Sequence, residues 1–440
     1  MKTVVSLISL VSFTLSPLRA EFHKSMYLVN GLSETLSKVD LPEGTVHEDI
    51  VSLGTFPNDI LIRGNLAYVI NSGSNDLSVI DLTDDSVLGI IDLGDGNNPW
   101  SGAFTNDTTL YVTNWLTRSV SRLSLGTGSI VRSIEVGDGP EGILADGDRL
   151  YVANSGWNGS GYGPGSVSVI DLSSDSVVST IGVGKNPQDL VNDPQGEIYV
   201  VCTGDFIGST GMLYLIDSAR LSVTDSLQIG GSPGRAAISQ SGLVYMAAGG
   251  WFGSGEVYLY DAMRETLIHG TGAPIPTGLG AMDVTTDSEG YMYACSFSQN
   301  SVSVFDIPDD SVTTYAVGSG PVAIAIREEP WMTFDTAPAR RFVQQGSVLD
   351  YTISLHHEGT EAESVIAASL LILPEGLPFS GNPFIGPFEL ALDPGDTIRL
   401  NLSEAIPAGA PSGRYVLFSM ARDINSRRMA VGSFWIHIVP

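Results

Sequence analysis

Short apolar runs of four to seven residues alternate with turn residues through the first three quarters of the chain. In the stretch from Leu150 to Leu190 the runs read LYVAN, SVSVIDL and VVSTIGV, and a fourth begins at QDL after the turn GKNP. Val, Ile, Leu and Tyr dominate the runs, while Gly, Asn, Asp, Ser and Pro bound them, which is typical of β-strands joined by tight turns. The pattern predicts a four-stranded antiparallel unit.

This unit recurs seven times. Its leading run contains a tyrosine in every copy, at intervals of 40 to 48 residues: Tyr27, Tyr68, Tyr111, Tyr151, Tyr199, Tyr245 and Tyr293. A repeat of that length, with four strands in each copy, is typical of a radial array of blades. We therefore expect an all-β fold that contains a seven-bladed β-propeller.

Two further positions repeat in register with the tyrosines. An aspartate closes the second run in six copies, where we expect its carboxylate to accept backbone N–H groups two residues on; these residues are Asp40, Asp81, Asp171, Asp217, Asp261 and Asp306. A proline opens the fourth run in six copies, at Pro57, Pro99, Pro140, Pro187, Pro233 and Pro321, with Gly280 at the equivalent place in the remaining copy. Proline has no backbone N–H to donate, and this is tolerated at the first residue of a strand. Each of these prolines therefore marks where the fourth strand begins.

The ends of the repeat region predict how the ring closes. The first copy begins directly at its tyrosine run, MYLVN, whereas the last copy ends with an extra proline-led run, PVAIAI, at residues 321–326. We expect this run to pair with MYLVN as the innermost strand of the first blade, because closure of that kind leaves no blade incomplete.

The runs AYVINSGSNDLSVIDL, LYVTNWLTRSVSRLSL and LYVANSG…SVSVIDL resemble the repeat of YVTN-type β-propellers, and residues 111–114 spell that motif. The resemblance covers about Met26 to Ile326. It implies the propeller fold but no single activity, because members of that family have varied roles. We expect the asparagine that ends the motif to adopt a left-handed conformation and to cap the following loop; it is found at Asn30, Asn71, Asn114 and Asn154.

The repeat stops near Pro330. The segment from Trp331 to Pro440 contains about seven apolar runs, some of them alternating, and predicts a β-sandwich. Within it, IPAGAPSGRYVLFSMARD resembles the late strands of bacterial immunoglobulin-like, CARDB-type modules. We therefore expect a signal peptide at residues 1–20, a seven-bladed propeller at 21–330 and an immunoglobulin-like β-sandwich at 331–440.

The first twenty residues contain Lys2, an apolar run from Val4 to about Leu15, and a small residue, Ala20, at their end. This is typical of a secretory signal peptide, and the run is too short to span a bilayer. We expect an exported protein that is secreted, periplasmic or on the cell surface, with no membrane span, lipid attachment or C-terminal anchor. The net charge of −28 repels phosphate backbones, so we do not expect nucleic-acid binding.

Cysteine and histidine usage predicts no cysteine-based or histidine-based site. Cys202 and Cys295 fall in the tyrosine runs of blades that are not neighbours, so we expect two buried free thiols and no disulfide. No CxxC pair, GxSxG elbow, HExxH sequence or DxDxDG loop occurs.

Candidate binding residues lie on glycine-rich loops. The loops that follow the tyrosine run are longest in blades four to six, where they read NSGWNGSGYGPG, CTGDFIGSTG and AAGGWFGSG. Aromatic rings on loops that share one face supply flat, amphipathic contact area. We expect a ligand-binding sector with Trp100 at its edge, formed by Trp115, Trp157, Tyr162, Phe206, Trp251 and Phe252. The alternative is that each ring folds over its own blade as part of the core.

A second candidate group stands near the strand-opening prolines, at the mouth of the central channel. It comprises Asp59, Ser101, Asp189 and Arg235, with Glu141 and Gln188 beside them. Carboxylate oxygens of such a group could bind Ca²⁺. The simpler expectation is that they are solvated, or paired with Arg235 and with the backbone N–H groups of the strand entries, without a cofactor.

We therefore expect a monomeric, non-catalytic binding protein that uses a propeller face to engage an extracellular or cell-envelope glycan, peptide or protein. The alternative is a metal-dependent lactonase-like or lyase-like propeller enzyme that uses Asp59 and Asp189. That alternative stays open because the propeller fold supports both kinds of function.

Overall fold

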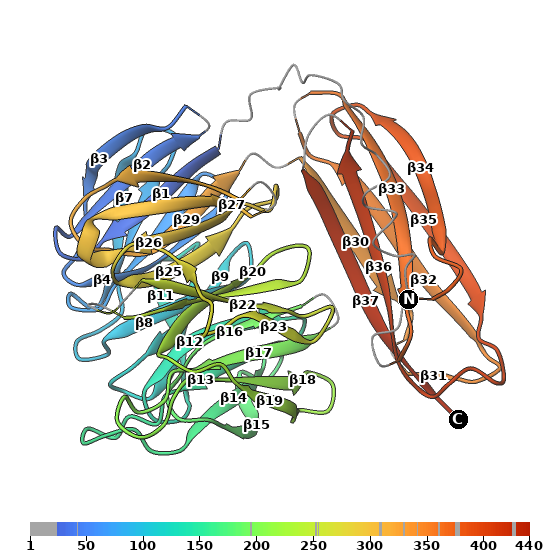
Figure 1. Ribbon diagram of the computed structural model, residues 1–440, viewed down its shortest axis with the longest axis horizontal. Helices are drawn as coiled ribbons and strands as arrows, with labels where there is room; N and C mark the ends of the chain where they lie inside the picture. The colour runs from blue at the N-terminus through green and yellow to red at the C-terminus, as the bar shows by residue number, and fades with distance from the viewer. Residues whose placement is uncertain are drawn as a thin grey trace. The chain divides into compact units, whose positions relative to one another are not determined.

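The structure is a computed structural model that describes residues 24–440 except 42, 194–195, 251–252, 254, 308–309, 329–330, 341, 360, 375–378 and 425–427. The chain divides into two compact units, one at His23–Glu328 and the other containing Glu329–Pro440 (Figure 1). The predicted signal peptide at residues 1–20 lies outside the described residues.

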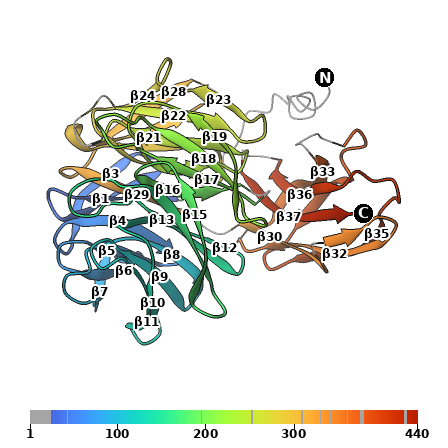
Figure 2. The same cartoon turned by 90° about the horizontal axis from the view of Figure 1, so that it is seen from below.

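The first unit is a seven-bladed β-propeller, as predicted, and each blade is an antiparallel sheet (Figure 2). From the innermost strand outward, blade one is β29 (Pro321–Glu328), β1 (Lys24–Asn30), β2 (Thr35–Leu41) and β3 (Thr45–Ser52). Blade two is β4 (Pro57–Arg63), β5 (Leu66–Asn71), β6 (Asp76–Asp81) and β7 (Ser86–Asp92). Blade three is β8 (Pro99–Asn106), β9 (Thr109–Asn114), β10 (Ser119–Ser124) and β11 (Ser129–Glu135).

The remaining blades follow the same order. Blade four is β12 (Pro140–Asp146), β13 (Arg149–Asn154), β14 (Gly165–Asp171) and β15 (Ser176–Val183). Blade five is β16 (Pro187–Asn192), β17 (Glu197–Cys202), β18 (Met212–Asp217) and β19 (Ser222–Gln228). Blade six is β20 (Pro233–Ile238), β21 (Leu243–Ala248), β22 (Glu256–Asp261) and β23 (Thr266–His269), with the short β24 (Ile275–Pro276) also paired to β22. Blade seven is β25 (Ala281–Thr286), β26 (Met292–Ser296), β27 (Ser301–Asp306) and β28 (Ser311–Ala316), with a 3₁₀ turn at Phe297–Gln299.

The predicted closure is confirmed. Strand β29 pairs antiparallel with β1, in a register that places Tyr27 opposite Ala325 and Leu28 opposite Ile324. The innermost strand of blade one therefore comes from the far end of the propeller sequence. This pairing joins residues almost 300 positions apart and leaves the first blade complete.

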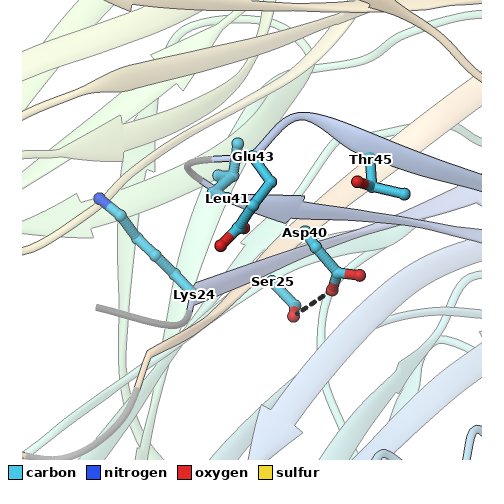
Figure 3. A pocket seen from close by; sticks show the side chains of 6 residues that line it. All are labelled: Lys24, Ser25, Asp40, Leu41, Glu43 and Thr45. Carbon is cyan, nitrogen blue, oxygen red and sulfur yellow. Dashed lines mark hydrogen bonds between the residues drawn. The ribbon is translucent and has the colours of Figure 1, made fainter. Parts of the chain in front are cut away.

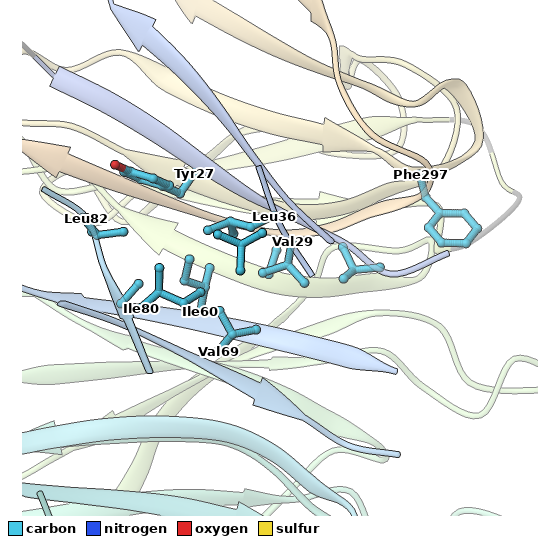
Figure 4. Close-up of a cluster of buried hydrophobic side chains, with 12 residues drawn as sticks. Tyr27, Val29, Leu36, Ile60, Val69, Ile80, Leu82 and Phe297 are labelled. Atoms are coloured by element: carbon cyan, nitrogen blue, oxygen red, sulfur yellow. The ribbon is translucent and has the colours of Figure 1, made fainter. Parts of the chain in front are cut away.

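Apolar side chains interlock between neighbouring blades. Figure 4 shows one such cluster, in which Tyr27 and Leu36 of blade one meet Ile60 and Ile80 of blade two. All seven repeat tyrosines are buried. The blade interfaces are therefore the core of the propeller, which explains why most residues of the two middle strands of each blade are buried.

The repeated aspartates start turns as predicted in four described copies. The carboxylates of Asp81, Asp171, Asp217 and Asp261 each accept the N–H group two residues on, at 2.8 to 3.1 Å. The prediction for the motif asparagines is wrong: none of the four has a positive φ angle. They end their strands in extended conformation, and each side-chain amide donates to at least one hydroxyl group on the next strand, as Asn114 does to Ser119 and Ser121 at 3.0 and 2.9 Å.

Both cysteines are free and buried, as predicted. Burial raises the pKa of the Cys202 thiol to about 12, and burial likewise raises the pKa of Cys295. Neither thiol is therefore a reactive thiolate near neutral pH.

The second unit is a sandwich of two β-sheets. One sheet has the order β30 (Met332–Pro338), β32 (Val348–His357), β35 (Thr397–Ala405). The other has the order β31 (Phe342–Gln344), β37 (Met429–Val439), β36 (Gly413–Asp423), β33 (Glu363–Ile372), β34 (Ile385–Leu392). Buried residues of both sheets, including Tyr351 and Phe434, form its core. The sandwich prediction is confirmed, with eight strands among the described residues of this unit where the apolar runs indicated about seven.

Candidate functional site

One face of the propeller, called here the loop face, collects two sets of loops. The loop that leaves each tyrosine strand meets the connection that enters the innermost strand of the same blade. Trp115 N–H, for example, donates to the Asn98 carbonyl at 3.0 Å, and Thr203 N–H donates to the Asn186 carbonyl at 2.9 Å. Side chains from both sets of loops are therefore presented together on this face.

Five aromatic rings form a continuous series on the loop face of blades three to five, called here the aromatic strip. Ring centroids are 6.3 Å apart for Trp100 and Trp115, 6.0 Å for Trp115 and Trp157, 5.1 Å for Trp157 and Tyr162, and 6.1 Å for Tyr162 and Phe206. Planes within the two tryptophan pairs differ by 28° and 20°. Fully overlapping rings would lie ~3.5–4 Å apart, so these rings are offset and part of each ring face is left uncovered by its neighbour.

The β13–β14 loop holds two of these rings in a small hairpin. Trp157 and Tyr162 form an antiparallel bridge, and Gly163 N–H donates to the Gly156 carbonyl at 2.8 Å. Gly156 has a φ of 77°, and a Cβ atom there would lie 2.7 Å from the Pro164 carbonyl oxygen. Glycine is thus required at this turn, and the loop presents its rings in a defined arrangement.

The β17–β18 loop is ordered around one carboxylate. Asp205 Oδ1 accepts the N–H groups of Ile207, Gly208 and Ser209 at 3.1, 2.7 and 2.8 Å, while Lys185 donates to Oδ2 at 2.8 Å. The hydrogen bond from Lys185, followed by those from the backbone, holds the pKa of Asp205 well below its usual range. This network positions Phe206, which is 61% exposed at the end of the strip.

The structure brings together five of the aromatic residues expected in this sector, Trp100, Trp115, Trp157, Tyr162 and Phe206. All except Phe206 are half-buried. Trp251 and Phe252 lie outside the described residues, so their place relative to the strip stays a prediction.

A second group, called here the axial cluster, lies where the innermost strands begin. In blades two, five and seven the register between the innermost strand and the tyrosine strand shifts after its first residue, which is a β-bulge. Just after each bulge stands an aspartate whose Oδ1 accepts the next backbone N–H: Asp59 at 3.0 Å, Asp189 at 2.9 Å and Asp283 at 2.9 Å. The other oxygen reaches the next blade, where it meets Ser101 Oγ at 2.7 Å, Ala236 N at 2.9 Å and Ile324 N at 2.8 Å, respectively.

Arg235 extends from the innermost strand of blade six to blade two, across the propeller axis. Its Nη1 donates to Asp59 Oδ1 at 2.7 Å and its Nη2 donates to the Asn58 carbonyl at 3.0 Å. Burial lowers the pKa of Arg235, but the charges of Asp59, Asp283 and Asp189 outweigh burial and hold it above its ordinary value. Arg235 is thus paired with Asp59, as expected, while Asp189 and Asp283 act on it through their charges.

Asp283 was not predicted from the sequence, because blade seven was aligned with the other blades one residue out of register. Strand β25 begins at Ala281, and its register shift between Ala281 and Asp283 matches the shift between Pro57 and Asp59. The residue equivalent to the prolines is therefore Ala281, and the assignment of Gly280 to that position is wrong. Without a proline, nothing in the local sequence marked the strand entry.

Glu141 connects the two groups of residues. It is the second residue of β12 and is 3% exposed, and its Oε1 accepts the Trp115 indole N–H at 3.3 Å. Burial raises the pKa of Glu141 to about 8, and burial likewise raises the pKa of Asp189 to about 6 and of Asp283 to about 7. These carboxyl groups hold protons in the folded state at pH values where exposed ones would be ionised.

The stability of the protein should therefore fall as pH rises from about 4.5 to about 8. Below pH 4.5 Glu141 is protonated in both the folded and unfolded chains, so it adds no pH dependence. As pH rises, the unfolded chain releases this proton while the folded chain keeps it, which favours unfolding. Glu141→Gln should raise the free energy of unfolding by about 2–4 kcal/mol at pH 8 and leave it nearly unchanged at pH 4.5.

Urea denaturation at several pH values measures this effect. Glu135→Gln, which changes an exposed glutamate on β11, should leave the wild-type pH profile intact. A Glu141→Gln protein with the same pH dependence as the wild type would contradict the assignment of a buried, protonated carboxyl.

No group of three or more His, Cys, Asp or Glu side chains in the described part of the chain is arranged to hold a metal ion. A small polar pocket, shown in Figure 3, lies in blade one, away from the loop face, and is lined by Lys24, Ser25, Asp40, Leu41, Glu43 and Thr45. Lys24 is already paired with Asp287 and Glu289, at 2.5 and 2.6 Å. Over the described residues, no helix has the length and apolar character needed to cross a membrane.

No protein-family model matches the chain, and no curated protein matches it. Solved structures do match. A proposed 6-phosphogluconolactonase from Bacteroides uniformis has a TM-score of 0.56 at 14% identity, covering 69% of this chain and 99% of that one. A protein of unknown function from Desulfotomaculum acetoxidans has a TM-score of 0.55 at 16% identity, with the same two coverages. Streptogramin B lyase has a TM-score of 0.52 at 10% identity, covering 69% and 92%. At these identities the likeness concerns the fold, and it identifies the larger part of this chain as a β-propeller.

Proposed function

We propose that this protein is a binding module that captures an extracellular or cell-envelope ligand on the loop face of its propeller, through the aromatic strip. The observation that supports the proposal most directly is the unbroken contact of five offset rings across three blades. Exposed or half-exposed aromatic rings in a row offer a large contact area at low conformational cost.

Two features of the surroundings support a binding role. The loops that hold the rings are ordered by their own hydrogen bonds, so little ordering would be needed when a ligand binds. Leu116 and Ile207 lie beside ring residues in the same loops and are 58% and 96% exposed. Exposed apolar side chains next to aromatic ones are typical of interaction surfaces.

Replacing Trp115 and Trp157 together with alanine should lower ligand affinity by at least about 100-fold, because each ring at the centre of an interface contributes ~1–3 kcal/mol. The free energy of unfolding should fall by only ~1–2 kcal/mol, from the loss of ring–ring contacts. A panel of soluble oligosaccharides and extended peptides, tested by calorimetry, would identify the ligand and measure the loss. Urea denaturation of the same proteins would measure stability.

Phe56→Ala provides a matched control, since Phe56 is 72% exposed and lies in the connection that enters blade two on the same face. This variant should bind like the wild type. If the double tryptophan variant instead loses about 3–5 kcal/mol of stability and keeps its affinity, the strip is a structural lid and the proposal fails.

The alternative of a metal-dependent lactonase or lyase has less support from the axial cluster. Asp59, Asp189 and Asp283 each direct both carboxylate oxygens at protein donors, and Arg235 supplies the positive charge among them. The lactonase and lyase names belong to structures that share only the fold with this chain. Elemental analysis for calcium and magnesium, together with a lactone-hydrolysis assay on Asp59→Ala and Asp189→Ala, tests the alternative.

Three finer assignments belong to the same proposal and rest on the sequence. They are export directed by residues 1–20, membership of the propeller repeats in the YVTN type, and an immunoglobulin-like identity for the sandwich. Each fits a protein that works outside the cytoplasm as a monomer.

A further inference from the structure

An unpartnered polar side chain lies in the connection that meets the loop of Phe206, at one end of the aromatic strip. Asn186 is in the connection that enters blade five, and its side chain is completely buried. Within the described residues, neither its amide nitrogen nor its amide oxygen makes a hydrogen bond. A buried amide without hydrogen-bond partners lowers folding stability by about 1–3 kcal/mol. Such groups are therefore rare in native proteins, and each calls for a specific explanation.

The same connection in blade three shows that this arrangement is not required by the fold. Asn98 precedes Pro99 as Asn186 precedes Pro187, and the two residues have similar φ angles of 50° and 54°. The Asn98 amide donates to the Ser72 carbonyl at 3.3 Å. An asparagine at this position can therefore be satisfied by the neighbouring loop, and at Asn186 it is not.

Tyr162 joins Asn186 to the strip and to Glu141. Burial raises the pKa of Tyr162, the charge of Glu141 raises it further, and the Asn186 amide opposes both. Both polar groups therefore act on the Tyr162 hydroxyl, while the Tyr162 ring contacts Trp157 and Phe206. Glu141 in turn accepts a long hydrogen bond, 3.3 Å, from the Trp115 indole.

We propose that Asn186, with Tyr162 and Glu141, forms a polar subsite that hydrogen-bonds the hydroxyl or acetamido groups of a neutral saccharide whose sugar rings stack on the aromatic strip. This inference rests on the proposed function and adds the chemical class of the ligand. Sugar rings have one apolar face that matches an aromatic ring and an edge of donors and acceptors that matches amide, phenol and carboxyl groups.

Charge favours a neutral saccharide over an acidic one. The chain has a net charge of −28. The two carboxylates beside the strip, Asp138 and Asp205, are each paired with a cation, Arg118 at 2.9 Å and Lys185 at 2.8 Å, so they offer an approaching ligand no free positive charge. An anionic ligand would meet repulsion on approach. A proline-rich peptide could use the rings, but it would have few groups to satisfy Asn186.

The experiment measures binding of cellohexaose, chitohexaose and decaproline to the full chain by calorimetry and tryptophan fluorescence. Asn186→Gly removes the amide and tolerates the positive φ, and Tyr162→Phe removes only the hydroxyl. Each should weaken binding of one or both saccharides by about tenfold without lowering the midpoint of urea unfolding. Asn98→Gly is the matched control, because it makes the same change at the equivalent, partnered asparagine, and it should leave affinity unchanged.

The results separate this inference from the proposed function. Saccharide binding that is lost in the Trp115→Ala, Trp157→Ala double variant but unchanged in Asn186→Gly and Tyr162→Phe would overturn the subsite and leave the strip as the binding surface. Binding of decaproline alone would overturn the saccharide class and also leave the strip. If neither cellohexaose nor chitohexaose binds to the wild-type protein, the inference is also overturned.

Discussion

A chain that ends at Gly320 should fail to form a stable propeller, whereas a chain that ends at Glu328 should fold. The eight residues between these points are β29, the innermost strand of blade one. Val322, Ala323 and Ile324 are buried, and the strand supplies the backbone partners of β1 along its whole length. Losing it exposes the edge of β1 and opens the contact of blade one with its neighbours, a loss comparable to the net stability of ~5–15 kcal/mol typical of a protein.

Circular dichroism during urea denaturation and limited proteolysis would measure this difference. The chain ending at Glu328 is the control for loss of the sandwich, since both truncated chains lack it. A cooperative unfolding transition at the same urea concentration in both chains would show that β29 is not needed for closure, contrary to its pairing with β1.

Arg235→Met should lower the free energy of unfolding by about 3–5 kcal/mol at pH 8, because it leaves buried carboxylates without their cation. The loss should be smaller at pH 5, where Asp189 and Asp283, whose pKa values burial raises to about 6 and about 7, take up protons and no longer need the charge. Urea denaturation at the two pH values measures both effects.

Two further variants sharpen this test. Arg220→Met removes an arginine whose side chain is 63% exposed and whose pair with Asp217 is 3.0 Å long, so it should cost no more than about 1 kcal/mol. Adding Asp59→Asn to Arg235→Met should restore part of the lost stability, because it removes one of the carboxylates left unpaired. If Arg235→Met were as mild as Arg220→Met, the bond across the axis would not hold blades two and six together.

The axial cluster and the aromatic strip are neighbouring groups with different roles. The axial cluster connects blades: each of its three aspartates accepts one hydrogen bond from its own strand and another from the next blade. The aromatic strip connects loops and leaves ring faces open. Glu141 belongs to both, so a ligand that moves Trp115 would also change the surroundings of a buried, protonated carboxyl.

The sequence by itself determined the propeller. Tyrosine runs, turn aspartates and strand-opening prolines are local signals, because each acts on the backbone within a few residues, and seven copies made the period unmistakable. The closure by residues 321–326 also followed from counting strands, since a complete ring needs one innermost strand for each blade. Aromatic residues on long loops were likewise visible before the fold was known.

Only the tertiary structure decided how side chains from different blades meet. Arg235 and Asp59 are 176 residues apart in the chain, and no local rule predicts that one crosses the axis to the other. Asp283 escaped notice because Ala281 lacks the fixed φ and missing N–H by which proline marks a strand entry. The role of the motif asparagines was misjudged because asparagine can either adopt a left-handed turn or bond across strands, and the packing against Ser119 and Ser121 selects the second. Ring-to-ring contacts and the unpartnered Asn186 amide depend on distances between blades, which the fold sets and the sequence does not display.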